Sequence, residues 1–381
     1  MNRRRTLATV LLMCCALLIA GCNTEQATAK PAAEKKREKQ RLPYVKSLHM
    51  IDGNKGWMLA IQDSSRRLLK TGDGGRSWRD VTPEAETVIP AYILDEKHVW
   101  LTTKEFADKQ LVYTADGGET WAKSEPLSTE SQMMGLHFLN EKTGWMTNYV
   151  RGIGAGGSQI ELAKTEDGGK TWVAISGGST EKEIPVEGYK SKAVLSSNDE
   201  GWIPLAASGH PWAYRSINGG ADWEFYSLPV TEQMPKEQFF DMQPPIFFSD
   251  TAGLIPLYFL TDRLEVYVYS TEDGGRNWDI PPALDIPLQN SGEYEIEMDA
   301  VSLNRMWLVS NRNEMYAFDN GWKTVASVKS LIENNARILA FDFINESEGW
   351  MAIGNEEGAL LYKTEDGGMS WNEVMVKNID L

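Results

Sequence analysis

Short apolar runs separated by polar turns recur along the chain from Leu42 to Leu381. The runs are rich in β-branched or aromatic residues, as in AYILD at 91–95, KAVLSS at 192–197, PIFFSD at 245–250 and LAFDFI at 339–344. Such composition and length are typical of buried strands. No segment keeps the apolar spacing of a helix over several turns. The pattern therefore predicts an all-β fold.

An octet that ends in tryptophan closes most of these strand groups. Its full copies are TGDGGRSW at 71–78, TADGGETW at 114–121, TEDGGKTW at 165–172, TEDGGRNW at 271–278 and TEDGGMSW at 364–371. Two copies differ, SINGGADW at 216–223 and AFDNGWKT at 317–324. A Gly-Trp element precedes the octet, as in FLNEKTGWM at 138–146. Each unit therefore contains a first strand, a Gly-Trp strand, a third strand and an octet turn into a fourth.

The spacing of the octets predicts the number of units. The residues at the acidic position are Asp73, Asp116, Asp167, Asn218, Asp273, Asp319 and Asp366. Steps of 43 to 55 residues between them match one four-stranded blade each. Radial packing of blades leaves only short sheet edges, so we expect a single seven-bladed β-propeller of four-stranded antiparallel blades over residues 42–381. Of the 14 tryptophans, six close an octet and six occupy the second strand, which indicates one packing role per blade.

The octet aspartates are predicted to hold turns. Two consecutive glycines permit positive φ, and an aspartate before them accepts hydrogen bonds from the amides of the turn. Asn218 can accept the same bonds without a charge, whereas an asparagine could not take the place of a catalytic acid. The octets lie in different blades and lack the alternating carboxylates of a calcium loop, so we predict no metal site and no cofactor there.

The N-terminus carries a targeting signal. Three arginines precede a short apolar run that ends in Leu-Ile-Ala-Gly-Cys, which resembles a bacterial lipobox. The resemblance implies a lipoprotein signal peptide at 1–21 and lipid attachment at Cys22, with the protein anchored on the extracytoplasmic face of the bacterial cell membrane. The segment after Cys22 to residue 41 has almost no apolar residue and has six Lys and Arg against three Glu, so we expect 22–41 to be a disordered basic tether. An ordinary cleaved signal or an uncleaved apolar anchor is the alternative.

Composition narrows the classes of partner. Beyond residue 41 the chain has 29 Lys and Arg against 51 Asp and Glu, a net charge of −22. A field of this sign repels phosphates, so we expect no nucleic-acid partner. Cys14 and Cys15 lie in the predicted signal and Cys22 would carry lipid, so the folded domain has no cysteine for a disulfide or a nucleophile.

The octets resemble the Asp-box, or BNR repeat, of sialidases, xyloglucanase-type glycosidases, the sortilin ectodomain and the photosystem II assembly factor family. In those families the box is a peripheral turn remote from the functional site. Alternation with a Phe and Gly-Trp element, as at Phe138 to Trp145 and Phe343 to Trp350, is most similar to photosystem II assembly factor-like propellers. Lipoprotein forms of these occur in bacteria. The resemblance specifies a fold better than a ligand.

No catalytic residues are predicted. The sequence has no Arg-Ile-Pro segment of the sialidase type, has seven repeats where sialidases have six, and is too short for the paired propellers of xyloglucanases. The histidines are His49, His98, His137 and His210, each in a separate repeat, and no G-x-S-x-G motif is present.

The first and third turns of a blade share one face, so the variable loops occupy the other face. The longest are 148–159 and 228–245, and the segment 206–212 adds a tryptophan that has no place in the repeat. Trp212, Phe239 and Phe240 come from the fourth and fifth repeats, and we predict them as anchors for a protein partner. Packing of these rings within their own blades is the alternative. We therefore predict a non-catalytic protein-binding module on the extracytoplasmic side. A carbohydrate-active protein, glycan-binding or glycosidic, is the second possibility, which a carboxylate pair lining the channel mouth would favour.

Overall fold

The computed structural model describes residues 40–83, 88–103, 110–127, 132–154, 156–178, 180–197, 199–280, 282–287, 296–311, 314–319 and 321–381. The chain from Lys39 to Leu381 forms one compact unit. The predicted signal peptide at 1–21, Cys22 and the tether lie outside the described residues, apart from Gln40 and Arg41. Within the described part, no helix is long and apolar enough to cross a membrane.

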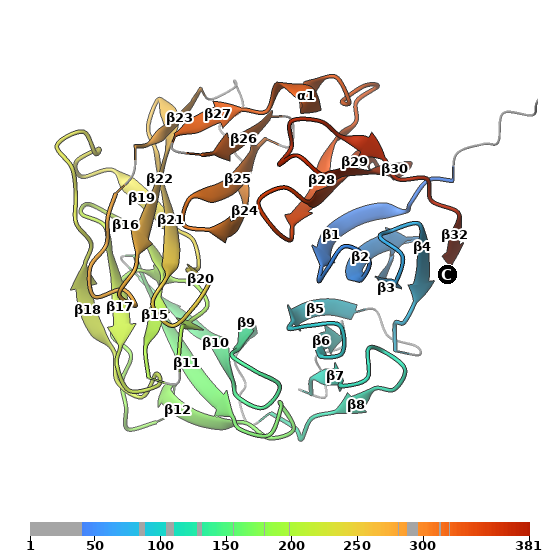
Figure 1. The fold of residues 1–381 in the computed structure, drawn as a ribbon. Coiled ribbons are helices and arrows are strands. Elements are labelled where there is room, and N and C mark those ends of the chain that lie inside the picture. Colours follow the sequence, from blue (N-terminus) through green and yellow to red (C-terminus); the bar gives the residue numbers. More distant parts are fainter. Residues whose placement is uncertain are drawn as a thin grey trace, which may run out of the picture. The chain divides into compact units, whose positions relative to one another are not determined.

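Antiparallel sheets follow one another around a central axis, in chain order from blue to red in Figure 1. Blade 1 consists of β1 (Tyr44–Met50), β2 (Gly56–Gln62), β3 (Ser65–Thr71) and β4 (Ser77–Asp80). Blade 2 consists of β5 (Val88–Ile93), β6 (Val99–Thr103), β7 (Val112–Thr114) and β8 (Ala122–Lys123). Blade 3 consists of β9 (Gln132–Phe138), β10 (Gly144–Ile153), β11 (Gly157–Thr165) and β12 (Val173–Gly177). Each blade begins at the channel and ends at the periphery.

The remaining strands complete the ring. Blade 4 contains β13 (Tyr189–Lys190), β14 (Val194–Leu195), β15 (Gly201–Ile203), β16 (Leu205–Ser208), β17 (Trp212–Ser216) and β18 (Glu224–Ser227). Blade 5 contains β19 (Phe239–Met242), β20 (Ile246–Phe247), β21 (Gly253–Leu260), β22 (Arg263–Thr271) and β23 (Leu284–Pro287). Blades 6 and 7 contain β24 (Ile296–Ser302), β25 (Arg305–Ser310), β26 (Glu314–Phe318) and β27 (Trp322–Thr324), and then, after the short helix α1 (Ala326–Lys329), β28 (Arg337–Phe343), β29 (Gly349–Asn355), β30 (Gly358–Thr364) and β31 (Asn372–Glu373).

The predicted fold class, an all-β propeller of four-stranded antiparallel blades, is confirmed. The strands of the described residues hydrogen-bond into seven sheets, one for each sequence repeat. One sheet takes strands from two repeats, however, because β16 pairs with β13 on one edge and with β19 of blade 5 on the other. Pro204 interrupts the second strand between β15 and β16, and a proline cannot donate a ladder hydrogen bond. The sheet of blade 5 is therefore extended by β16 and β13 of the fourth repeat, whereas β14, β15, β17 and β18 form a sheet of their own, which the repeat did not predict.

Tryptophans of the second strands connect neighbouring blades. Six of them are at most 1% exposed: Trp57, Trp100, Trp145, Trp202, Trp307 and Trp350. The indole N–H of Trp145 donates to the Gly219 carbonyl in the octet turn of blade 4, at 3.0 Å. Equivalent bonds run from Trp100, Trp307 and Trp350 to octet glycines of the following blade. These rings are thus the main apolar contact and a polar link between blades.

The octet turns have the geometry that the sequence predicted. In six of the seven turns both glycines have positive φ, for example 78° at Gly168 and 85° at Gly169. Asp167 accepts hydrogen bonds at Oδ1 from the Thr165 hydroxyl (2.9 Å) and the Thr171 amide (3.0 Å), and at Oδ2 from the Thr171 hydroxyl (2.7 Å). The Gly168 amide donates to the Lys142 carbonyl, which holds the first and third turns on one face.

The two variant octets differ in instructive ways. Asn218 accepts from the Asp222 amide at 2.9 Å and donates its own side-chain N–H to the Asp222 carboxylate at 2.8 Å. The carboxylate and its neutral partner have thus exchanged places along the turn. At Asp319 the amide donates to the Gly321 carbonyl, and Arg305 lies 3.9 Å from the carboxylate. This turn therefore has a different hydrogen-bond pattern.

Asp167→Asn is expected to lower the free energy of unfolding by less than about 1 kcal/mol, because an amide oxygen can keep the bonds from Thr165 and Thr171. Asp167→Ala removes all three bonds and should cost roughly 2–3 kcal/mol. Urea denaturation of both variants measures the difference. A folded Asp167→Asn protein that lost function would contradict a purely structural role.

Candidate functional site

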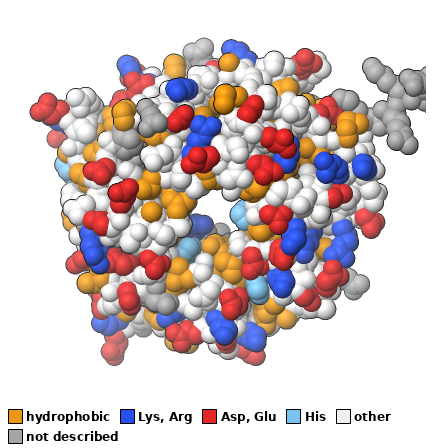
Figure 2. All heavy atoms as spheres, viewed as in Figure 1, with side chains coloured by type: hydrophobic (Ala, Val, Ile, Leu, Met, Phe, Trp, Pro, Cys, Tyr) orange, Lys and Arg blue, Asp and Glu red, His pale blue; other side chains and the backbone are white. Residues whose placement is uncertain are grey.

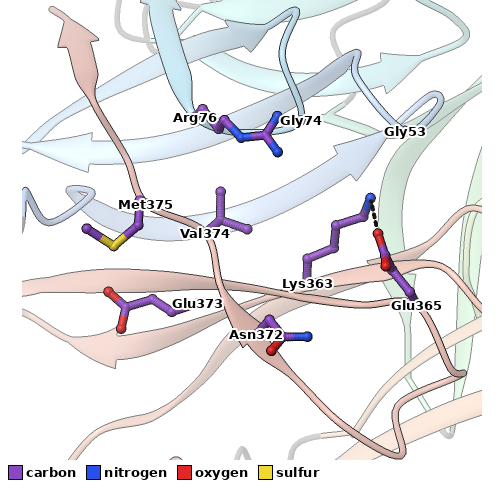
Figure 3. A pocket seen from close by; sticks show the side chains of 9 residues that line it. All are labelled: Gly53, Gly74, Arg76, Lys363, Glu365, Asn372, Glu373, Val374 and Met375. Atoms are coloured by element: carbon purple, nitrogen blue, oxygen red, sulfur yellow. Dashed lines mark hydrogen bonds and ion pairs between the residues drawn. The ribbon is translucent and has the colours of Figure 1, made fainter.

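Three places on the ring combine a hollow or an exposed apolar surface with polar groups. The first lies where the ring closes between blades 7 and 1. Here β32 (Asn378–Asp380) pairs in parallel with β4, and Leu42 forms a bridge with Ala359. Figure 3 shows the resulting pocket of ≈ 340 Å³, lined among others by Arg76, Lys363 and Glu365.

The charged groups of this ring-closure pocket have partners within the pocket or beside it. Lys363 forms ion pairs with Glu348 and, at 3.3 Å, with Glu365, and its Nζ lies 4.8 Å from the centre of the Trp350 ring. Arg76 donates to the Asp73 carbonyl. Because these groups are satisfied internally, we interpret the pocket as a junction that holds the ring together.

The second place is the central channel, visible as an open hollow in Figure 2. One residue from each innermost strand pairs with the second-strand tryptophan or its replacement Leu254, and so occupies the same position in its blade: His49, Tyr92, His137, Val194, Ile246, Asp299 and Asp342. Several of these side chains reach the backbone of the next blade. The Tyr92 hydroxyl donates to the Phe138 carbonyl (3.1 Å), and His137 Nε2 donates to the Leu195 carbonyl (2.7 Å).

Two carboxylates occupy neighbouring positions of this channel ring. Asp342 accepts the Met50 amide at 2.7 Å, and Asp299 accepts the Phe343 amide at 2.6 Å. Burial and the charge of Asp342 raise the pKa of Asp299 to about 7. His49 lies 3.5 Å from Asp342, and although its burial acts in the other direction, hydrogen bonding and charge from Asp342 raise its pKa.

This is the kind of acidic pair that would favour carbohydrate chemistry. Each carboxylate, however, has an oxygen that accepts a main-chain amide of the following blade. A carboxylate in this arrangement stabilises the contact between blades, which is the same role that Tyr92 and His137 have on the opposite side of the ring. The geometry therefore accounts for both aspartates without a substrate.

The third place contains the predicted anchors, and the structure separates them. Phe239 is 43% exposed at the start of β19, whereas Phe240 is fully buried against Phe259, with ring centres 6.3 Å apart. Trp212 is half-buried on β17 and stacks on the exposed ring of Phe225, at 5.1 Å. Of the three predicted residues, Phe239 has a freely exposed ring, while the Phe240 side chain belongs to the core.

The shared sheet adds a residue that sequence reasoning missed. Tyr189 of β13 pairs with Ala206 of β16, which pairs with Asp241 of β19, and Ser208 pairs with Phe239. Paired residues point to the same side of a sheet, so these five form one continuous patch, which we call the blade 4–5 surface. Tyr189 is 53% exposed. It was missed because its segment, 181–192, has no alternating apolar pattern.

A buried lysine supports the edge of the blade 4–5 surface. The ammonium of Lys190 donates to the carbonyls of Ser158 and Glu187, both at 2.8 Å, and its amide donates to the Ser158 hydroxyl at 3.0 Å. Gly157 and Gly188 form a parallel bridge beside it. Burial lowers the pKa of Lys190 to about 8. The backbone of blades 3, 4 and 5 is thus hydrogen-bonded across two blade boundaries, and the exposed rings stand on a fixed base.

The site residues do not suggest a metal centre. In the part of the chain that the structure describes, no group of three or more His, Cys, Asp or Glu side chains is arranged to hold a metal ion.

The comparisons with known proteins concern the fold. No family model and no curated protein matches this chain. It is similar to a solved structure of YCF48 bound to D1 peptide, with a TM-score of 0.55 and 17% identity over 86% of this chain and 94% of that one. For YCF48 from Cyanidioschyzon merolae the TM-score is 0.52, with 14% identity over 86% and 96% of the two chains.

A puromycin-hydrolysing peptidase from Mycobacterium tuberculosis gives a TM-score of 0.52 and 8% identity, over 89% of this chain and 54% of the peptidase. At such identities the likeness defines a class, the β-propellers, and no ligand. Among the propellers compared, the YCF48 structures match this chain over almost their whole length.

Proposed function

We propose that this chain is a lipid-anchored, extracytoplasmic β-propeller that binds a protein partner through the blade 4–5 surface. The observation that carries the proposal is the blade 5 sheet extended by β16 and β13 of the fourth repeat, on which Tyr189 and Phe239 are 53% and 43% exposed. Exposed aromatic rings on a rigid polar base are typical of the energetic centres of protein interfaces.

The class of partner is supported by similarity. A propeller of the same fold, YCF48, has been solved with a D1 peptide bound. Together with the repeat resemblance, this supports a non-catalytic assembly or stability factor for a membrane or envelope complex. The lipid at Cys22 and the tether at 22–41 would keep the propeller near such a complex. The octets are, on this proposal, Asp-boxes in their usual peripheral role.

Site-directed photo-crosslinking tests the proposal. A photo-crosslinking residue placed at Phe239 of the full anchored chain should capture one membrane or envelope protein, whereas the same residue at Phe225, which is 62% exposed on the outer strand, should not. Tyr189→Ser with Phe239→Ser should reduce capture by roughly tenfold or more, since truncation of such anchors costs about 2 kcal/mol or more. Phe240 is left intact because its loss would disturb the core.

Two controls make the result decisive. Cys22→Ala should move the protein from the membrane fraction to the soluble fraction, which tests the anchor separately from the binding surface. Equal capture from positions 225 and 239, or no loss of capture in the double variant, would place the binding site elsewhere. Retention of a polysaccharide in place of a protein would support the carbohydrate alternative.

A further inference from the structure

A second hollow, separate from the blade 4–5 surface, lies at the end of the channel that carries the octet turns. This channel-mouth cavity has a volume of ≈ 540 Å³. Its walls come from blades 2 to 5 and combine polar groups, among them His137, Ser196 and Asp250, with an apolar part. The apolar part is formed mainly by Phe138, Leu139, Pro244, Ile246, Phe247 and Phe248. Such a wall is suited to an apolar body of several carbon atoms.

One cation faces this apolar lining. Lys192, between β13 and β14, lines the cavity. Asp250 also lines it, but neither Asp250 nor any other described residue forms an ion pair with Lys192. Its aliphatic stem lies over Gly135 of β9, so that a Cβ at that glycine would lie 2.9 Å from Lys192 Cδ. The glycine thus provides the space in which the lysine stem lies.

Three further properties of the lining bear on the charge of Lys192. Burial lowers its pKa, with no carboxylate acting against it. The pKa of His137 is lowered mainly by burial and, to a smaller extent, by the positive charge of Lys192. The hydroxyl of Ser196, also in the lining, has no hydrogen-bond partner among the described residues. The Lys192 side chain is half-buried, and a ligand carboxylate would supply the counter-charge that its partly desolvated ammonium lacks among the described residues.

We propose that the channel-mouth cavity binds a monoanionic carboxylate with an apolar body, and that Lys192 pairs with the carboxylate. The apolar body contacts the proline and phenylalanine wall and gains roughly 0.8 kcal/mol per buried methylene. An ion-paired hydrogen bond to Lys192 adds about 1.5–3 kcal/mol. Polyanions are disfavoured, because the domain around the cavity has a net charge of −22.

Two sources could supply this chemistry, a free amphiphilic acid or the C-terminal residue of a polypeptide. Both place one carboxylate next to an apolar group. For both sources the site is separate from the blade 4–5 surface. Phe239 is the first residue of β19, towards one face of the ring, whereas Phe247 is the last residue of β20, towards the opposite face.

Calorimetric titration of the full chain with octanoate tests the inference. Octanoate should bind, whereas octylamine, with the opposite charge, should not. Lys192→Met keeps the stem length and removes the charge, and it should weaken octanoate binding by roughly tenfold or more. Lys182→Met is the matched control, because that lysine is exposed and pairs with Asp222 at 2.7 Å, and it should bind octanoate as the unchanged protein does.

A second pair of probes identifies the source. A short peptide that ends in phenylalanine with a free carboxylate is compared with the same peptide as a C-terminal amide. Tighter binding of the free-acid peptide than of octanoate supports a polypeptide terminus, and the reverse order supports a free acid. Octanoate affinity unchanged in Lys192→Met, or no binding of either carboxylate to the unchanged protein, would overturn the inference.

Folding of the variant can be judged independently. Since burial disfavours the charged form of Lys192, Lys192→Met should melt at the same or a higher temperature than the unchanged protein. Gly135→Ala provides a second test that retains the charge, because the added methyl group displaces the lysine stem. It too should weaken octanoate binding, and an unchanged affinity would contradict the role of this stem position.

Discussion

Trp145→Ala is expected to lower the free energy of unfolding by about 3–5 kcal/mol, which is enough to unfold a propeller of ordinary stability at moderate denaturant concentration. The ring is 1% exposed, and its N–H donates to the Gly219 carbonyl of the next blade. Truncation therefore leaves a cavity at a blade boundary and removes the donor of a buried bond. Lys164, whose Nζ lies 5.6 Å from the ring centre, also loses its contact.

Trp172→Ala is the matched comparison. This octet tryptophan is half-buried, and its N–H donates within its own turn, to the Gly169 carbonyl at 3.1 Å. We expect a clearly smaller loss than for Trp145→Ala, because the cavity opens towards solvent and no bond between blades is broken. Urea denaturation followed by circular dichroism measures both. Equal losses of unfolding free energy in the two variants would show that the tryptophan at the blade boundary contributes no more to stability than the octet tryptophan.

The contribution of His137 to stability should fall as the pH is lowered from about 7 to about 4, in opposition to that of Asp299, whose raised pKa favours the folded state in acid over the same range. Burial, followed by the charge of Lys192, lowers the pKa of this imidazole from its ordinary value of 6.5 to about 4. Between these two values the unfolded chain binds a proton that the folded protein does not, so acid favours unfolding. The full shift corresponds to at most about 3 kcal/mol, since the ring keeps partial exposure to the channel.

The variant His137→Gln isolates this contribution. A glutamine side chain offers a neutral N–H donor towards the Leu195 carbonyl and does not titrate. The difference in unfolding free energy between the two proteins should therefore change with pH over this window. His49 acts with the opposite sign, because its pKa is raised and its contribution is lost as the pH rises. A difference that stays constant from about pH 7 to about pH 4 would refute the assignment to His137.

Features that repeat with the octet were predictable. The spacing of Asp73, Asp116 and their equivalents predicted the blades, and the substitution at Asn218 predicted a turn-holding side chain, which accepts the expected hydrogen bond from the Asp222 amide. These predictions succeeded because each depends on residues within one repeat, where short-range hydrogen bonds determine the backbone.

Features that depend on contacts between repeats were not predictable. The pairing of β16 with β19 joins residues more than 30 positions apart, and no local pattern announces it. Similarly, adjacent residues of a strand point to opposite sides, so only one of Phe239 and Phe240 could be exposed. Two adjacent phenylalanines in the sequence do not indicate which ring is exposed. The orientation of each ring is determined by the pairing of β19 with β16 on one side and with β21 on the other.

The parallel pairing of β32 with β4 has a consequence for how the chain folds. The outer edge of the first blade is covered by residues near the end of the chain, Asn378 to Asp380, which form the strand beside Ser77 to Arg79. During synthesis this edge stays without its partner until residues 378–380 have been made. Blade 1 is thus completed only after all the other blades have been synthesised, and closure of the ring is coupled to the synthesis of all seven repeats.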